Sequence, residues 1–95
     1  MAKRAQQIEF GKFLIIACTA GELMAVTGAA QCVCDWCGSV CHKSYDGYYI
    51  AVLNQWFCKE CFEDWKQRAV WYPEDASIER KNFDFYAPLL GVKCQ

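Results

Sequence analysis

The sequence lacks several features that define common classes of protein. Its 95 residues have a formal net charge of −1 and include a single histidine. The apolar run over residues 13–17 is too short for a secretion signal or a membrane span. The absence of basic excess argues against nucleic acid as the default partner, because neutralising phosphates supplies most of the affinity of such domains. One histidine provides little for acid–base or nucleophilic chemistry. We therefore expect a non-enzymatic, cytoplasmic protein.

The composition is rich in apolar and aromatic residues instead. The hydrophobic share is 55% and the aromatic share 16%, which argues against disorder. A domain of this size buries a modest part of its surface, so a metal, disulfides or a partner chain is expected to add stability. We interpret residues 1–95 as a single domain without repeats, beginning with a loose polar arm over residues 1–9.

The cysteines form the most informative pattern. Of the eight, Cys34 and Cys37 are followed after twenty residues by Cys58 and Cys61, each pair having two residues between its members. This spacing matches a common zinc-site pattern, in which roughly 15–20 residues separate two such pairs. Four thiolates close a tetrahedral shell and leave no open position for water, which is typical of a structural site. We predict one structural Zn²⁺ bound by these four cysteines.

The two pairs differ in the residues directly after them. Gly38 comes directly after Cys37, and glycine permits the left-handed turn that directs backbone N–H groups at thiolate sulfur. Phe62 comes directly after Cys61, where an amphipathic segment begins. The second pair should therefore lie in a first helical turn, where free N–H groups and the helix dipole favour negative charge.

The segment before the cysteine pairs is expected to form part of the hydrophobic core. Apolar residues predict a buried strand over residues 10–18. Thr19 and Glu22 fit a capping box and predict a short helix over residues 23–27. An alternative interpretation makes the same segment a hairpin, in which residues 12–18 pair with residues 22–27.

Between the two pairs, the sequence predicts a hairpin. Asp46-Gly47 is a turn signal, and residues 48–53 favour a strand. A second turn at Asn54-Gln55, longer than two residues because Gln55 replaces the preferred glycine, leads to the returning strand Trp56-Phe57. Residues 58–70 continue as an amphipathic helix, which Pro73 ends.

The last part of the chain is ambiguous. Ile78, Phe85 and Leu89 fit one helical face, whereas residues 82–85 alternate between polar and apolar as a strand does. We interpret residues 32–72 as the zinc finger and residues 73–95 as a C-terminal extension. Exposed aromatic residues of a partner surface are expected at Trp71-Tyr72 and in the cluster Phe83–Tyr86.

The tight turn around Cys34 and Cys37, a zinc knuckle, is followed by a hairpin and a helix. This order resembles a treble-clef zinc finger over residues 34–70. The runs Gly47-Tyr48-Tyr49 and Trp56-Phe57-Cys58-Lys59-Glu60-Cys61-Phe62 are similar to half of a LIM domain. The resemblance implies a small α+β zinc-binding domain that mediates protein–protein interaction, as an adaptor or regulator. A LIM domain carries two zinc sites in tandem, and no second complete set of four ligands follows Cys61, so only the four ligand positions carry over.

Two other functions are compatible with the sequence. GATA-type treble clefs bind nucleic acid with a similar spacing, although acidic residues dilute the basic ones on the helix. A rubredoxin-like electron carrier would place iron in four thiolates, but that family has glycine where this chain has Phe62. Cys32, Cys41 or His42 could replace one of the four ligands, but this is the minor alternative, and for His42 a surface position or a position beside the ligands is favoured. We expect Cys18 to be a buried apolar residue and Cys94 to be a free thiol.

Overall fold

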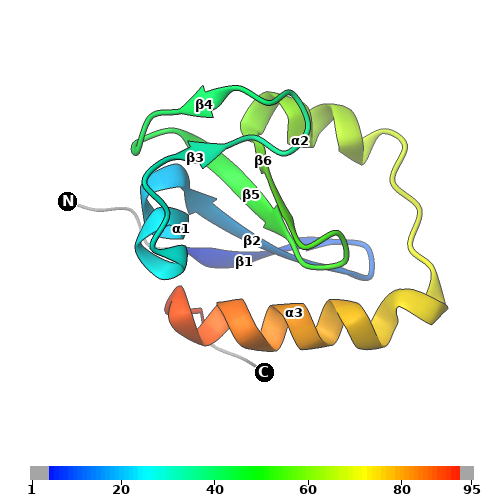
Figure 1. Cartoon of the computed structure of the whole chain (residues 1–95). Helices are drawn as coiled ribbons and strands as arrows, with labels where there is room; N and C mark the ends of the chain where they lie inside the picture. The colour runs from blue at the N-terminus through cyan, green and yellow to red at the C-terminus, as the bar shows by residue number, and fades with distance from the viewer. Residues whose placement is uncertain (1–4, 93–95) are drawn as a thin grey trace.

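The structure, a computed structural model, describes residues 5–92 and shows a small α+β fold (Figure 1). Four antiparallel strands form one sheet in the order β1-β2-β5-β6, and β3 pairs with β4 in a second sheet. The strands are β1 Gln6–Phe10, β2 Phe13–Thr19, β3 Cys32–Val33, β4 Val40–Cys41, β5 Asp46–Ile50 and β6 Gln55–Cys58. The helices are α1 Ala20–Thr27, α2 Lys59–Lys66 and α3 Ala76–Leu89, with a short 3-10 turn, η1 Pro73–Asp75, before α3.

One face of the four-stranded sheet packs against α2. The strand register places Tyr48 opposite Phe57, so both side chains project from the same face. Tyr48 stacks on Phe62 with ring centroids 4.0 Å apart, and Phe13 meets Trp65 edge-on at 5.0 Å. The apolar side chains of α2 are thereby buried, as the sequence periodicity predicted. The helix is shorter than the predicted residues 58–70: it ends at Lys66, well before Pro73.

The opposite face packs against α3, which runs along the sheet in Figure 1. Glu79, Phe83 and Ala87 are spaced by four residues, share one side of the helix and are buried. Both carboxylate oxygens of Glu79 accept hydrogen bonds, from the backbone N–H of Leu14 at 2.9 Å and from the indole N–H of Trp71 at 3.0 Å. A buried carboxylate with two donors is satisfied, so Glu79 joins the helix to the sheet and to the segment before it.

The helical interpretation of the last segment is thus correct, but its buried face is a different one. The stripe Ile78, Phe85 and Leu89 is on the outside of α3, with exposures of 56%, 61% and 55%. Phe83, two residues before Phe85, is 1% exposed and is the residue that reaches the core. Apolar spacing alone did not distinguish the two faces, because both carry apolar residues.

The N-terminal part departs from expectation in two ways. Residues 6–9, expected in a loose arm, belong to β1, which pairs with β2 along its whole length. The single strand expected over residues 10–18 is divided by a tight turn at Gly11, whose φ is +57°, a conformation that glycine adopts without strain. Backbone pairing with β2 and the packing of Ile8 and Phe10 against the core explain the order of β1, whose other side chains are polar. Residues 1–4 of the arm lie outside the described residues.

The capping box is confirmed. The Thr19 hydroxyl accepts the Glu22 N–H at 3.2 Å, and the Glu22 carboxylate accepts the Thr19 N–H at 2.7 Å. Helix α1 starts at Ala20 and ends at Gly28, which has a left-handed φ of 73°. The alternative hairpin between residues 12–18 and 22–27 is wrong, because reciprocal capping satisfies the helix start locally.

The hairpin β5–β6 exists, but the turn signal at Asp46-Gly47 is wrong: both residues are in β5. A Cβ atom on Gly47 would clash with the ring of Trp56, so glycine makes room for that indole within the strand pair. The indole N–H of Trp56 donates to the Cys18 carbonyl at 3.2 Å. The connecting turn spans residues 51–54 and ends at Asn54, which has a left-handed φ of 53°. The loop is longer than two residues, as expected, but it lies earlier than predicted: residues 51–53 were assigned to the strand, and Gln55 begins β6.

Candidate metal centre

The first cysteine pair lies in a loop between β3 and β4 that has the backbone geometry of a knuckle. The N–H of Cys34 donates to the carbonyl of Ser39 at 3.0 Å, and the N–H of Gly38 donates to the carbonyl of Cys34 at 2.8 Å. Gly38 has a φ of 75°, the left-handed value expected from the sequence. These bonds close the loop tightly, which brings the thiols of Cys34 and Cys37 near one another.

Asp35 attaches this loop to the end of β6. Its backbone N–H donates to the Trp56 carbonyl at 3.0 Å, and its carboxylate accepts the Trp56 N–H at 2.9 Å. Two residues beyond Trp56, the N–H of Cys58 donates to the Cys34 sulfur at 3.3 Å. Asp35 therefore fixes the position of the loop along β6 and so brings the first cysteine pair next to the second.

The second pair comes from the start of α2. Cys58 is the N-cap residue with φ −64° and ψ 162°, and its side chain makes no capping hydrogen bond. Cys61 lies in the first turn, three residues further along. Both cysteines lie at the helix start, as the sequence predicted. Uncapped N–H groups and the positive end of the helix dipole stabilise negative charge there and act against the rise in pKa that burial causes.

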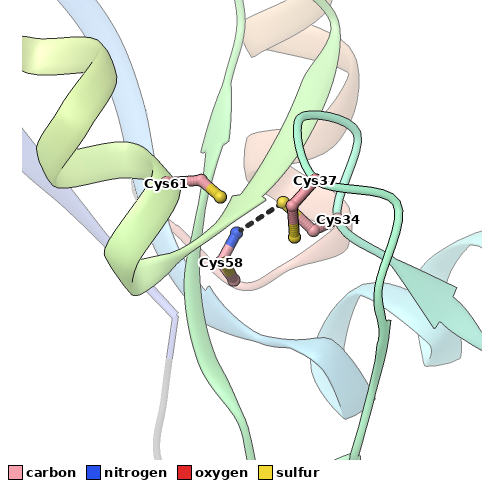
Figure 2. A group of neighbouring side chains, drawn as sticks. All are labelled: Cys34, Cys37, Cys58 and Cys61. Atoms are coloured by element: carbon pink, nitrogen blue, oxygen red, sulfur yellow. Dashed lines mark hydrogen bonds between the residues drawn. The ribbon is translucent and has the colours of Figure 1, made fainter.

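The four thiols converge on one point (Figure 2). Their sulfur atoms all lie within 4.8 Å of one another. Tetrahedral zinc with Zn–S bonds of about 2.3 Å places its sulfurs roughly 3.8 Å apart, so only a small contraction separates this arrangement from a metal shell. Within residues 5–92, no other set of three or more histidine, cysteine or acidic side chains is this close. The cluster can hold a metal ion.

Burial is uneven across the cluster. Cys34 and Cys58 are buried, Cys61 is half-buried and Cys37 is exposed. Hydrogen bonds from Ser39 lower the pKa of Cys37 to about 6. Burial raises the pKa of Cys58 and Cys61, and neighbouring thiols raise that of Cys61 further. Four thiols at this separation cannot all ionise without a cation, so metal binding must displace protons.

The other candidate ligands lie outside the cluster. Cys32 and Cys41 occupy opposite positions of the β3–β4 pair. His42 is exposed, and its Nδ1 atom lies 2.9 Å from the Ser44 hydroxyl. Cys18 is buried in β2, and its pKa rises to about 12 because of that burial, in agreement with the expected apolar role. Cys94 lies outside the described residues.

Two residues that shape the site carried no interpretable signal in the sequence. Ser39 provides hydrogen bonds to the thiol of Cys37, and Asp35 joins the loop to β6. Both are common residues between or beside cysteines, and their roles depend on the fold that brings β6 alongside the loop.

A cavity adjoins the exposed side of the cluster. It has a volume of about 450 Å³, and its lining includes Cys37, Cys41 and Cys61. At its rim, the hydroxyl of Tyr45 donates to Glu60 at 2.9 Å, and this carboxylate raises the pKa of Tyr45 to about 12. Solvent reaches the cluster from this side.

Comparison with protein-family models, curated proteins and solved structures found no match for this chain. None of the helices within residues 5–92 is long and apolar enough to cross a membrane. The function must therefore be inferred from the geometry of the site.

Proposed function

We propose that this chain is a zinc-stabilised module for protein–protein interaction, acting as an adaptor or regulator. The observation that carries the proposal is the convergence of four thiols from a knuckle and a helix start within 4.8 Å. Zinc bound there supplies a structural cross-link between the β3–β4 loop and α2. All four positions are cysteines, so the shell is closed and the role is structural.

Zinc suits this donor set better than a redox-active iron. Iron in a rubredoxin-like site sits between two equivalent knuckles, each with a glycine after its second cysteine. Here the second pair continues into α2, and Phe62 is buried against Tyr48 and Trp65 instead of forming a turn. The pair therefore has the knuckle-and-helix asymmetry that supports a treble-clef-like finger.

A partner protein is supported by the outer surface of α3. The exposed stripe of Ile78, Phe85 and Leu89, which we call the α3 stripe, has more than half of each side chain in contact with solvent. Exposed apolar side chains arranged along one helix face are typical of helix-mediated contacts. Of the other aromatic residues expected in a partner surface, Tyr72 is 52% exposed, whereas Trp71 is half-buried and Phe83 is buried in the core.

Nucleic acid is less well supported by the arrangement of charge. On α2, Lys66 lies 3.3 Å from Glu63 and sits over the rings of Phe10 and Phe62. Just beyond α2, Arg68 pairs with Asp64, which lies four residues before it. Cations already paired with carboxylates provide little free charge for phosphates.

Metal binding is tested by native mass spectrometry of the full chain after addition of zinc, and then by substitution with cobalt. We expect one ion per chain and the intense thiolate-to-cobalt absorption of a four-sulfur site. Replacing Cys34, Cys37, Cys58 or Cys61 by serine should abolish that spectrum, whereas Cys18→Ser should retain it. Unchanged binding by the four variants, or a red iron-containing protein on purification, would contradict the proposal.

The interaction role is tested separately by cross-linking and mass spectrometry with the metal-loaded chain as bait. We expect one reproducible partner whose recovery falls in Phe85→Ser. Val40→Ser is the matched control, because Val40 is an equally exposed apolar residue, at 63%, on a different element. Equal loss of the partner in both variants would contradict a role for the α3 stripe.

A further inference from the structure

A second pair of thiols lies beside the metal centre. Cys32 and Cys41 occupy directly opposite positions in the antiparallel pair β3–β4. Both side chains are buried, at 5% and 8% exposure, and neither belongs to the four-thiol cluster. Both are present as free thiols.

The register places the two side chains on the same face of the ribbon. Val33 and Val40 form the next opposite pair and project to the other face, where Val40 is 63% exposed. Opposite residues of antiparallel strands have Cα atoms about 4.5–5.5 Å apart and Cβ atoms about 4.5–5.5 Å apart. A disulfide requires Cα atoms about 4.4–6.8 Å apart and Cβ atoms about 3.5–4.5 Å apart, so a slight approach of the strands suffices.

We propose that Cys32 and Cys41 form a reversible disulfide by thiol–disulfide exchange with a low-molecular-weight disulfide such as oxidised glutathione. Of the two thiols of this pair, Cys41 lines the cavity beside the metal centre and Cys32 does not. Cys41 is therefore the one of the two that a small reagent reaches from this cavity. Its sulfur attacks the reagent, forms a mixed disulfide and releases one thiol. The sulfur of Cys32 then displaces the second thiol. The chain loses two electrons and two protons, and both are recovered in the two released thiols.

The bond would join the two strands at the base of the knuckle. The ring that it closes contains Cys34 and Cys37, two members of the four-thiol cluster. Fixing β3 to β4 keeps these two thiols in position when a metal–sulfur bond breaks. Slower loss of metal is therefore the expected effect, and this consequence, unlike the disulfide itself, rests on the proposed metal-binding function.

A competing bond would have the opposite effect. Cys34 faces Ser39 across the loop, so Cys41 is its diagonal neighbour on the same face. A disulfide between Cys41 and Cys34 would remove one member of the cluster and release the metal. The chain with a Cys32–Cys41 disulfide and the chain with a Cys34–Cys41 disulfide have the same polypeptide mass. They differ in whether the metal is retained.

The experiment treats the zinc-loaded full chain with oxidised glutathione and measures its intact mass under native conditions. We expect the loss of two hydrogen atoms with the metal retained. Cleavage before Asp35 separates Cys32 from Cys41, so fragmentation of the linked peptides identifies the bonded sulfurs without any mutation. Cys32→Ser should stay at its reduced mass or carry one glutathione, whereas Cys18→Ser should oxidise as the unmodified chain does.

Three results would overturn the disulfide: no loss of hydrogen, a linkage to Cys34 with loss of metal, or unchanged oxidation of Cys32→Ser. The same treatment of the metal-free chain separates the two proposals. Linkage of Cys32 to Cys41 in a chain that binds no metal would sustain the disulfide and refute the metal module. The expected slower loss of metal is tested by the rate at which zinc transfers to a chelator. We expect this rate to be several-fold lower after oxidation, and equal rates before and after oxidation would refute the effect on metal loss.

Discussion

The two ends of the molecule are stabilised in different ways. At the metal end, residues 32–41 form two strands of two residues each, and the side chains buried there are the thiols of Cys32, Cys34 and Cys41. At the other end, the four-stranded sheet is enclosed between α2 and α3. Its core residues Ile15 and Phe83 are 0% and 1% exposed. Little apolar surface is buried within the metal end, so we expect its order to depend on polar contacts and on the proposed ion.

Several contacts connect the two ends. Asp35 donates its backbone N–H to the Trp56 carbonyl and accepts the Trp56 N–H with its carboxylate, and Cys58 donates its N–H to the Cys34 sulfur. The indole of Trp56 reaches into the sheet. Because hydrophobic burial stabilises one end and the proposed metal coordination the other, we expect a perturbation to act mainly on the end in which it lies. Substitutions and a change of pH at each end can test that separation.

The largest effect is expected for Cys61→Ser. Loss of one ligand removes up to the apparent free energy of structural zinc binding, about 10–16 kcal/mol at neutral pH in isolated fingers. We expect no stoichiometric metal and rapid hydrogen exchange of the amides in residues 32–41. Amides of β2 and β5 should stay protected, because the apolar core remains. Complete unfolding of the sheet would show that the two ends are not independent.

Phe83→Ala should destabilise the sheet end by about 3–5 kcal/mol, since it empties a buried aromatic site. Denaturant unfolding of the metal-loaded protein measures this change. Phe85→Ala on the same helix is the control and should change the free energy of unfolding by less than about 0.5 kcal/mol. Similar losses in both variants would contradict the assignment of the buried face of α3.

Lower pH should weaken metal binding. Because the pKa values of Cys58 and Cys61 lie above the usual 9.0 in the metal-free protein, both carry protons at neutral pH. Metal binding displaces those protons, so the apparent affinity should fall roughly tenfold per pH unit for each proton as the pH is lowered from about 8 towards about 6. Competition with a chelator of known protonation behaviour measures this slope. A pH-independent affinity would contradict thiolate ligation.

Glu79→Ala should cost roughly 2–4 kcal/mol, because it leaves the Leu14 N–H and the Trp71 indole N–H without their acceptor. Thermal unfolding of the metal-loaded chain reports the change. Glu74→Ala, an exposed carboxylate shortly before α3, is the control and should be nearly silent. Metal stoichiometry should not change in either variant.

The smallest effect is expected for Thr19→Ala. Removing the capping hydroxyl of α1 should cost about 1 kcal/mol, as is typical for an N-cap. Thr27→Ala at the other end of the same helix is the matched control, because its exposed hydroxyl donates within the helix, to the Leu23 carbonyl. Chemical denaturation measures the free energy of unfolding of both variants. Equal losses of stability would contradict a specific role for the capping box.

Local patterns predicted much of this structure. The reciprocal bonds of Thr19 and Glu22, the left-handed Gly38 and the buried stripe of α2 depend on interactions within a few residues. The turn assigned to Gly47 was wrong, because that glycine accommodates a distant indole in the strand pair. The prediction of a loose arm was wrong for residues 6–9, because backbone pairing with β2 and the packing of Ile8 against the core order a segment whose other side chains are polar.

By itself, the sequence determined which four cysteines can share an ion, since two short spacings restrict where their sulfurs can point. Only the tertiary structure decided that Asp35 joins the knuckle to β6, that Phe83 and Glu79 are the buried side of α3, and that Cys32 faces Cys41. The two-residue spacing within each cysteine pair restricts the relative positions of its sulfurs, because only a short stretch of backbone separates them. Contacts between residues far apart in the chain depend on how strands and helices pack, which no local pattern encodes.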